Sequence, residues 1–427
     1  MNRHFVSAPV IEITRLANGF TVVTERMPEI ATATLGVWVG AGSRHEDGTE
    51  HGLSHLIEHM AFKGTARRSA RRIAEDIENV GGDINAATSV EYTSYTAKVL
   101  GDDIPVALDV IGDILTASAF EDAELAREKG VILQEYAAVE DTPDDLVYDA
   151  FMETAFAGQP LGRPILGTPD TVGSFDADMI RLFMAREYTP PRMVLAAAGD
   201  VEHAQVLEAA ERFFGGTTVP AREDAVPGCY TGGDRRIPRK LEQANLVIGL
   251  PGLSFKDPGY YATHLFAHVL GGGLTSRLWH EVRETRGLAY SIDAFHWPFT
   301  DCGVFGIGAG TAGRDVADLV AVTLDCLRRA AADVDNLELA RAKAQMKFAL
   351  LTALETPAGR IERVARQLLA WGRVIGSDEI VERIDAVTVE DVRESGRRLL
   401  GGAPTVAAIG PVKRLPRFEE IARGLKP

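Results

Sequence analysis

The chain has 427 residues, enough for two to three domains of about 100–200 residues each. Hydrophobic residues make up 46% and charged residues 25%, which is typical of folded proteins and excludes wholesale disorder or a fibrous repeat. The formal net charge of −16 disfavours partners such as nucleic acid and anionic lipid and favours cationic ligands such as basic peptides.

No apolar run approaches the roughly 18–20 residues that a membrane helix needs, so we expect no membrane span. The N-terminal segment lacks the apolar stretch of a secretory signal, which favours a cytoplasmic protein. A mitochondrial matrix protein whose presequence has been removed is the alternative. Cys229, Cys302 and Cys326 are odd in number and lack C-x-x-C spacing, so we expect reduced thiols and no thiolate metal cluster.

Strand signals open the chain. Apolar alternation on both sides of Asn18-Gly19 is a strong hairpin signal. Gly81-Gly82 ends a helical pattern and precedes a second alternating region. The expected elements are strands at 10–16, 20–25 and 32–39, helices at 52–62 and 70–80, and a hairpin over 83–100.

Amphipathic helices are expected next, at 104–117, 122–140 and 146–155, followed by a strand at 192–198. Strands, helices and hairpins are thus interleaved, which favours an α+β fold over a purely parallel sheet. Residues 215–238 are rich in Gly and Pro and lose apolar periodicity, so we expect a linker there.

The same order of elements recurs after this linker. The second series comprises a strand at 244–250, helices at 260–270 and 273–284, and a hairpin over 288–308. The same order of elements in two halves of about 200 residues each predicts a duplicated domain. We therefore expect domains at 1–216 and 239–427 joined by 217–238, each with a mostly antiparallel sheet and helices packed on one side.

The segment HLIEH at 55–59 carries the strongest chemical signal. On a helix, His55, Glu58 and His59 share one face. Two imidazoles are typical zinc ligands, and zinc lowers the pKa of a bound water towards about 7. A neighbouring carboxylate can accept the proton of that water and deliver it to a leaving amine. The motif H-x-x-E-H is the signature of inverted zincins, so we expect one Zn²⁺ per chain, with Glu58 as general base in peptide hydrolysis.

A catalytic zinc site needs a third protein ligand, and spacing alone does not select it. The predicted helix at 122–140 offers four glutamates, each of which also fits a solvated acidic stripe: Glu124, Glu128, Glu135 and Glu140. The second half repeats the motif only as HLFAH. Because this copy lacks the glutamate, we expect His264 and His268 to bind no zinc.

Five segments carry a resemblance to a known family. They are HLIEHMAFKGT from 55, GGDINAATSVEYTSY at 81–95, REKGVILQEYAAVEDTPDDLVYDAF at 127–151, QPLGRPILGT at 159–168 and GGGLTSRLWHEVRETRGLAYSI at 271–292. Together they resemble the pitrilysin-like zinc metallopeptidases, most closely the catalytic β subunit of the mitochondrial processing peptidase and its bacterial relatives. The resemblance covers nearly the whole chain and implies two domains that enclose a peptide-binding cleft.

The resemblance also implies site residues. Glu135 would be the third zinc ligand, and Glu128 would orient a ligand from behind. Asn85 and Ala86 would hold substrate beside the zinc, on an edge strand that pairs with an extended peptide. An ordinary interior strand is the alternative for that segment.

Two further pairs follow from the same resemblance. Asp145 and Asp149, four apart on a helix, would bind a substrate guanidinium, although such residues, taken without the resemblance, are more often surface charges. Arg283 and Tyr290 would reach the substrate and its developing oxyanion. Taken without the resemblance, Arg283 fits the surface of a helix and Tyr290 fits an apolar core.

The implied function is a zinc endopeptidase that cleaves extended, basic peptides or presequences. Its relatives work in pairs, so a homodimer, or a heterodimer with a related subunit lacking the zinc motif, is expected, in the bacterial cytoplasm. The alternative is a non-catalytic structural or assembly subunit, or a peptide-binding protein, of the same family. Structural subunits typically lose motif residues, whereas this chain retains all four that the resemblance assigns to zinc chemistry.

Overall fold

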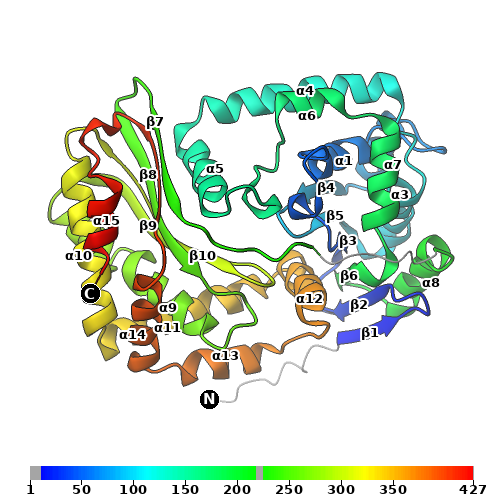
Figure 1. Ribbon diagram of the computed structural model, residues 1–427. Coiled ribbons are helices and arrows are strands. Elements are labelled where there is room, and N and C mark those ends of the chain that lie inside the picture. The colour runs from blue at the N-terminus through cyan, green and yellow to red at the C-terminus, as the bar shows by residue number, and fades with distance from the viewer. Residues whose placement is uncertain (1–10, 218–224, 427) are drawn as a thin grey trace, which may run out of the picture. The chain divides into compact units, whose positions relative to one another are not determined.

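The computed structural model describes residues 11–217 and 225–426, which form two compact units (Figure 1). Among the described residues, those of the first unit lie within 1–136, 165–225 and 351–375. Those of the second unit lie within 137–164, 226–350 and 376–427. Each unit therefore includes one segment from the opposite half of the sequence.

The first unit is built on a six-stranded sheet in the order β1-β2-β6-β3-β5-β4. Its strands are β1 (Ile11–Arg15), β2 (Thr21–Arg26), β3 (Thr32–Val39), β4 (Asp83–Thr88), β5 (Thr93–Leu100) and β6 (Met193–Gly199). Only β2 and β6 run parallel; the other neighbours are antiparallel. Gly19, at a φ of 92°, makes the predicted turn between β1 and β2, because glycine adopts this left-handed conformation without strain.

Both faces of this sheet are buried. Alternate strand residues such as Val22 and Val37 join the large core beneath the helices of the same half. These helices are α1 (Leu53–Ala61), α2 (Ala70–Glu78), α3 (Ile104–Thr116), α4 (Asp122–Glu140), α6 (Pro169–Ser174), α7 (Ala177–Glu187) and α8 (His203–Phe214). The intervening residues, including Val23 and Trp38, pack against a single helix from far along the chain, α12 (Pro357–Trp371).

The second unit has a five-stranded sheet in the order β7-β11-β8-β10-β9. Its strands are β7 (Gly233–Pro238), β8 (Gln243–Gly252), β9 (Ala289–Pro298), β10 (Gly303–Ala312) and β11 (Thr405–Gly410), of which only β7 and β11 pair in parallel. Its other helices are α9 (Tyr260–Gly271), α10 (Val316–Asp333), α11 (Asn336–Ala353), α13 (Ser377–Ala386), α14 (Val389–Leu400) and α15 (Phe418–Gly424).

The helix α5 (Pro143–Ala155), from the first half of the sequence, packs on the second sheet. Ile248 and Leu250 of β8 belong to the core beneath the helices of the second half. Gly249, which lies between them, faces the other way: a Cβ at this position would meet the ring of Phe151 at 2.3 Å. The absence of a side chain at Gly249 lets the aromatic ring of α5 lie directly on the strand.

The predicted fold class is confirmed, because each half of the chain forms a mostly antiparallel sheet with its own helices on one face. In addition, one helix from the opposite half covers the other face of each sheet. Two local predictions were wrong. The end of the predicted linker is the strand β7, whose charged edge sequence hides the apolar alternation. The helix predicted at 273–284 is replaced by a turn and a π-helix at Trp279–Glu284, since three consecutive glycines disfavour helix.

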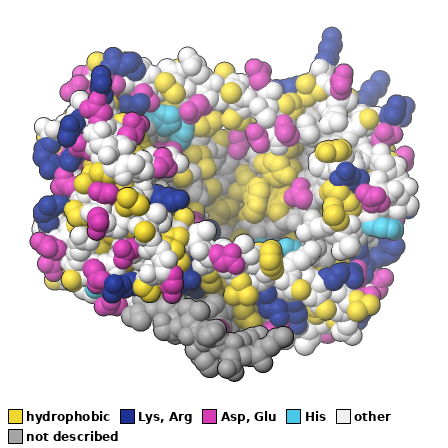
Figure 2. Space-filling model, turned by 180° about the vertical axis from the view of Figure 1, so that it is seen from behind, with side chains coloured by type: hydrophobic (Ala, Val, Ile, Leu, Met, Phe, Trp, Pro, Cys, Tyr) yellow, Lys and Arg dark blue, Asp and Glu magenta, His cyan; other side chains and the backbone are white. Residues whose placement is uncertain are grey.

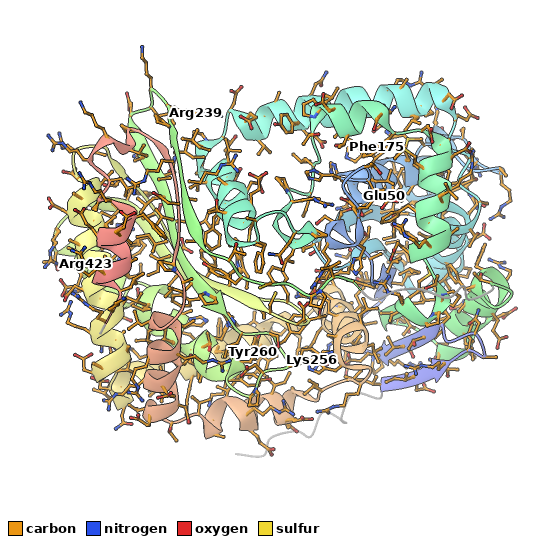
Figure 3. All side chains as sticks on the ribbon, viewed as in Figure 1. Glu50, Phe175, Arg239, Lys256, Tyr260 and Arg423 are labelled. Carbon is orange, nitrogen blue, oxygen red and sulfur yellow. The ribbon has the colours of Figure 1, made fainter. Side chains whose placement is uncertain are left out.

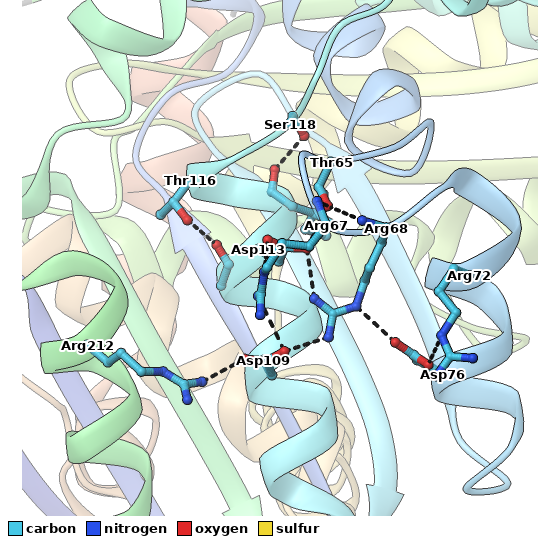
Figure 4. A network of polar contacts seen from close by, with 12 residues as sticks. Thr65, Arg67, Arg68, Arg72, Asp76, Asp109, Asp113, Thr116, Ser118 and Arg212 are labelled. Atoms are coloured by element: carbon cyan, nitrogen blue, oxygen red, sulfur yellow. Dashed lines mark hydrogen bonds and ion pairs between the residues drawn. The ribbon is translucent and has the colours of Figure 1, made fainter.

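The loop after α1 is fixed to α3 by a network of charged groups (Figure 4). The carboxylate of Asp113 accepts hydrogen bonds from Thr65 Oγ1 at 2.6 Å, Arg67 Nε at 2.9 Å and an Arg68 guanidinium nitrogen at 2.7 Å. Asp109, one turn earlier on α3, also binds Arg68. Buried charges are stable only when paired and hydrogen-bonded in this way.

Acidic and basic side chains are interspersed over the face shown in Figure 2. None of the helices within the described residues combines the length and the apolar character needed to cross a membrane.

Candidate metal centre

Helix α1 carries the H-x-x-E-H motif on its one incompletely buried face. Leu53, Leu56, Ile57 and Met60 point into the core, because they recur at the three- and four-residue spacing of a helix. The residues between them, His55, Glu58 and His59, are only partly buried. The hydrophobic pattern of the helix thus orients the motif.

The carboxylate of Glu135 on α4 meets both histidines. Its Oε2 lies 3.7 Å from His55 Nε2 and 3.6 Å from His59 Nε2. Ligand atoms about 2.0–2.2 Å from a tetrahedral zinc are about 3.3–3.6 Å apart, so these two spacings are close to those between zinc ligands. Across residues 11–217 and 225–426, no other three His, Cys, Asp or Glu side chains gather closely enough to hold a metal ion.

A second carboxylate contacts the ring nitrogen of His59 that faces away from Glu135. Glu128 Oε2 lies 3.1 Å from His59 Nδ1, so that Nδ1 donates and Nε2 keeps its lone pair for a metal. The other oxygen of Glu128 lies 2.8 Å from Lys63 Nζ. The sequence analysis missed Lys63, although a cation four residues after His59 was a signal for it.

His55 is neutral near pH 7. Burial lowers its pKa to about 4, and the neighbouring His59 adds to this effect against the opposing charge of Glu135. A metal-binding imidazole must be unprotonated at the ligating nitrogen. His55 is therefore in the state that zinc requires.

Glu58 has no hydrogen bond or ion pair within the part of the chain that the structure describes. Its charge acts on two buried tyrosines, Tyr95 and Tyr188, whose hydroxyl oxygens lie 2.8 Å apart. Burial raises the pKa of Tyr188 to about 12. The carboxylate of Glu58 is thus available to a water molecule, as a general base must be.

The strand β4 lies at the edge of the first sheet and, among the described strands, pairs only with β5, so the interior-strand alternative was wrong. Asn85 is exposed and Ala86 is buried. The hydroxyl of Thr88, at the end of β4, donates to the carbonyl of Ser54 on α1 at 3.3 Å. The free edge of β4 and the metal helix are therefore neighbours within one unit.

Asp145 and Asp149 lie on α5, in the second unit. Burial raises the pKa of Asp149 to about 6, with further contributions from Glu153, Asp145 and Glu140. Two of these neighbours have cationic partners: Glu140 binds Arg239, which is labelled in Figure 3, at 2.7 Å, and Glu153 binds Arg235. Within the described residues Asp145 and Asp149 have none.

Arg283 and Tyr290 also lie in the second unit, where they contact each other. The guanidinium of Arg283 lies 4.0 Å from the ring centre of Trp279 and 4.8 Å from that of Tyr290. Tyr290 is 79% exposed, so the core-aromatic alternative was wrong. The half-buried guanidinium of Arg283 thus lies against the exposed ring of Tyr290.

His264 and His268 on α9 lie beside His296, with ring centres 5.5 and 6.0 Å from that of His264. Burial lowers the pKa of His264 to about 3, and the other two histidines contribute. No carboxylate completes a metal-binding group with them among the described residues. That this cluster binds no zinc stays a prediction.

A helix with H-x-x-E-H whose two histidines meet a distant glutamate defines the class of inverted-zincin metallopeptidases. Comparison with protein families agrees with this class. Residues 21–169 match the insulinase family of peptidases, Peptidase family M16, and residues 174–346 match the Peptidase M16 inactive domain. The chain belongs to peptidase family M16.

Curated relatives support this assignment. A protein of Streptomyces coelicolor named an uncharacterised zinc protease is 40% identical over 410 residues, covering 94% of this chain and 89% of the relative. A Bacillus subtilis protein with the same description is 37% identical over 406 residues, covering 93% and 98%. The predicted resemblance and the predicted class, a zinc metallopeptidase, are confirmed. A particular closeness to the mitochondrial processing peptidase stays a prediction.

Two solved structures share the fold. A protease from Helicobacter pylori superimposes with a TM-score of 0.86 at 21% identity, covering 94% of this chain and all of the other. A chain of complex III from Candida albicans also superimposes with a TM-score of 0.86, at 24% identity, covering 98% of this chain and 100% of the other. At these identities the likeness concerns the fold alone.

Proposed function

We propose that this chain is a zinc-dependent endopeptidase that cleaves extended, basic peptides or presequences. The observation that carries the proposal is the meeting of His55, His59 and Glu135 at spacings that suit zinc. The relatives named zinc proteases support the same choice of metal.

His55, His59 and Glu135 would hold the metal, which would supply a bound water of lowered pKa. Glu58 would accept one proton from the attacking water and deliver it to the amide nitrogen as the C–N bond breaks, which gives a carboxylic acid and an amine. Glu128 and Lys63 keep the ring of His59 in the required tautomer.

Substrate binding would combine backbone and side-chain recognition. Around Asn85 and Ala86, the free edge of β4 can pair with an extended peptide. The unpaired carboxylates of Asp145 and Asp149 suit a substrate arginine. Arg283 and Tyr290 would contact the substrate and its oxyanion.

The proposed function also includes a cellular location and an oligomeric state. We expect a bacterial cytoplasmic protein, in line with the bacterial origin of the curated relatives. We also expect it to act as a homodimer or with a related subunit that lacks the zinc motif. The alternative is a non-catalytic subunit or peptide-binding protein, and the complete set of motif residues favours the enzyme.

Glu58→Gln tests the proposal. The purified chain should contain one zinc and cleave a library of arginine-containing peptides, whereas Glu58→Gln should keep the zinc and lose at least about 100-fold in kcat. Glu124→Gln, the same change on α4 at a residue paired with Arg127, is the matched control and should cleave normally. Cleavage by Glu58→Gln at the normal rate would refute the assigned base.

A further inference from the structure

The N-terminus of the metal helix is capped by a carboxylate from outside the helix. The N-cap residue of α1 is Gly52, which has no side chain to accept a hydrogen bond. Glu46 takes this role: its Oε2 accepts from Gly52 N at 2.9 Å and its Oε1 from Ser54 N at 2.7 Å. Glu46 is only 2% exposed, so water does not replace it.

The helix cannot supply its own cap because another segment packs against its start. Gly52 has a φ of 96°, and a Cβ there would lie 2.7 Å from the Cα of Gly167. The hydroxyl of Thr171 also donates to the carbonyl of His51 at 2.7 Å. This close approach requires glycine at position 52 and leaves the capping to a residue elsewhere.

The place of Glu46 also matters electrostatically. His55 is the third residue of α1 and lies in its first turn. A helix N-terminus carries a partial positive charge equivalent to about +0.5, which disfavours a cation bound beside it. An anionic carboxylate at this end offsets that charge. Glu46 also fixes the backbone N–H groups of Gly52 and Ser54, and therefore the backbone that precedes His55.

We propose that Glu46 is a positioning residue for the metal centre, which fixes the first turn of α1 and offsets the positive end of the helix next to His55. The inference rests on the proposed function. To the residues that act in that function it adds Glu46, which touches neither metal nor substrate.

The burial of Glu46 supports a role beyond folding. Burial raises its pKa to about 7, against the lowering effect of the hydrogen bonds from Gly52 and Ser54, and the charge of Glu50 adds to the rise. Burial thus disfavours the ionised form of Glu46, and a cation bound nearby would favour it.

The test is zinc affinity in the full-length chain. Zinc is removed with a chelator, and zinc alone is titrated back against a chromophoric competitor for the wild type and Glu46→Gln. The glutamine amide presents N–H groups to a backbone N–H and carries no charge. We expect the zinc Kd to rise about tenfold, as for other groups that support ligands indirectly. In addition, kcat should fall while KM stays within about twofold.

Asp113→Asn is the matched control. Asp113 is a carboxylate 1% exposed in the same unit that likewise accepts several hydrogen bonds, but its partners lie in the loop after α1. We expect it to lower the melting temperature without changing the zinc Kd. An unchanged Kd in Glu46→Gln, or an equal rise in both variants, would overturn the inference.

A conservative variant covers the case in which Glu46→Gln does not fold. Glu46→Asp keeps the charge but shortens the reach, so its Kd should lie between those of the wild type and the tenfold-weakened state. A wild-type Kd for Glu46→Asp alongside an unfolded Glu46→Gln would overturn the inference. A wild-type chain that binds no zinc would overturn the proposed function as well, whereas zinc binding and cleavage with an insensitive Glu46→Gln would overturn the inference alone.

Discussion

The indole Nε1 of Trp38 on β3 donates a hydrogen bond to Glu362 Oε2 on α12, at 3.2 Å and across 324 positions of sequence. The hydroxyl of Tyr92 donates to the other oxygen of the same carboxylate at 3.0 Å. Beside them, the guanidinium of Arg360 binds the buried carboxylate of Glu25. Helix α12 is therefore an integral part of the first unit, although the second half of the sequence encodes it.

Removing a core side chain from α12 should destabilise the first unit. Ile361 is 1% exposed and packs against the outer face of the sheet. Ile361→Ala should lower the free energy of unfolding by about 2–4 kcal/mol, because it leaves a cavity. Urea denaturation measures the change. Leu337→Ala on α11, where the side chain is 70% exposed, is the control and should change it by less than about 0.5 kcal/mol.

Glu128→Gln should weaken zinc binding about 10–100-fold, since it removes the negative charge that orients His59 through its Nδ1. Competition with a chromophoric chelator measures the affinity. Glu124→Gln on the same helix, whose partner is Arg127, should leave it unchanged. A zinc affinity that is insensitive to Glu128→Gln would exclude the orienting role.

Asp149 should make peptide binding depend on pH. Its pKa, raised to about 6, means that the carboxylate is mostly neutral at pH 5 and ionised at pH 7. The KM for peptides with an arginine near the cleaved bond should therefore rise below pH 6 in the wild type. This part of the pH profile should be absent in Asp149→Asn, and peptides without arginine serve as the control. An identical KM profile in both proteins would remove Asp149 from arginine recognition.

The same residue should affect stability with a defined sign. Because the pKa in the folded state lies above the usual value of 3.8, the folded chain binds the proton more tightly between about pH 4 and 6. The stabilisation that this proton provides is lost as the pH rises through about 6. Asp149→Asn should thus be more stable than the wild type at pH 7 and indistinguishable from it near pH 3.5. Thermal melts at the two pH values measure this difference.

Asp113 should show the opposite pH dependence. Burial alone would raise its pKa, but the hydrogen bonds from Thr65, Arg68 and Arg67 outweigh it and the pKa is lowered. The stabilisation that ionised Asp113 gives to the folded chain is therefore present above about pH 4 and is lost as the pH falls further. Asp113→Asn should lower the free energy of unfolding at pH 7 by about 1–3 kcal/mol, because it removes the buried negative charge that accepts hydrogen bonds from Arg67 and Arg68. The difference should shrink at pH 3, and a constant difference would contradict the pKa.

Local sequence patterns predicted most individual elements. The periodicity of 122–140 gave the bounds of α4, and Asn18-Gly19 gave the first hairpin. The spacing of His55, Glu58 and His59 on α1 followed from helical geometry. Periodicity says which face of a helix is buried but not what covers it. For this reason the sequence did not reveal that α5 and α12 pack on the sheet of the opposite half.

The residues around the metal ligands were harder to predict for a similar reason. Family resemblance, and not spacing, selected Glu135 among four glutamates on one helix. Lys63 and Glu46 act through contacts with other residues, and charged residues near a motif are too common to be singled out. Only the three-dimensional contacts of Glu128 and of the start of α1 identify them.

The crossing of α5 and α12 constrains how chimeras of related peptidases can be built. A recombination point in the segment between the two halves of the sequence would pair each parental sheet with a covering helix from the other parent. The aromatic ring of Phe151 over Gly249 and the carboxylate of Glu362 under Trp38 would then face unmatched surfaces. Functional hybrids should instead exchange residues 137–164 together with the second sheet and residues 351–375 together with the first.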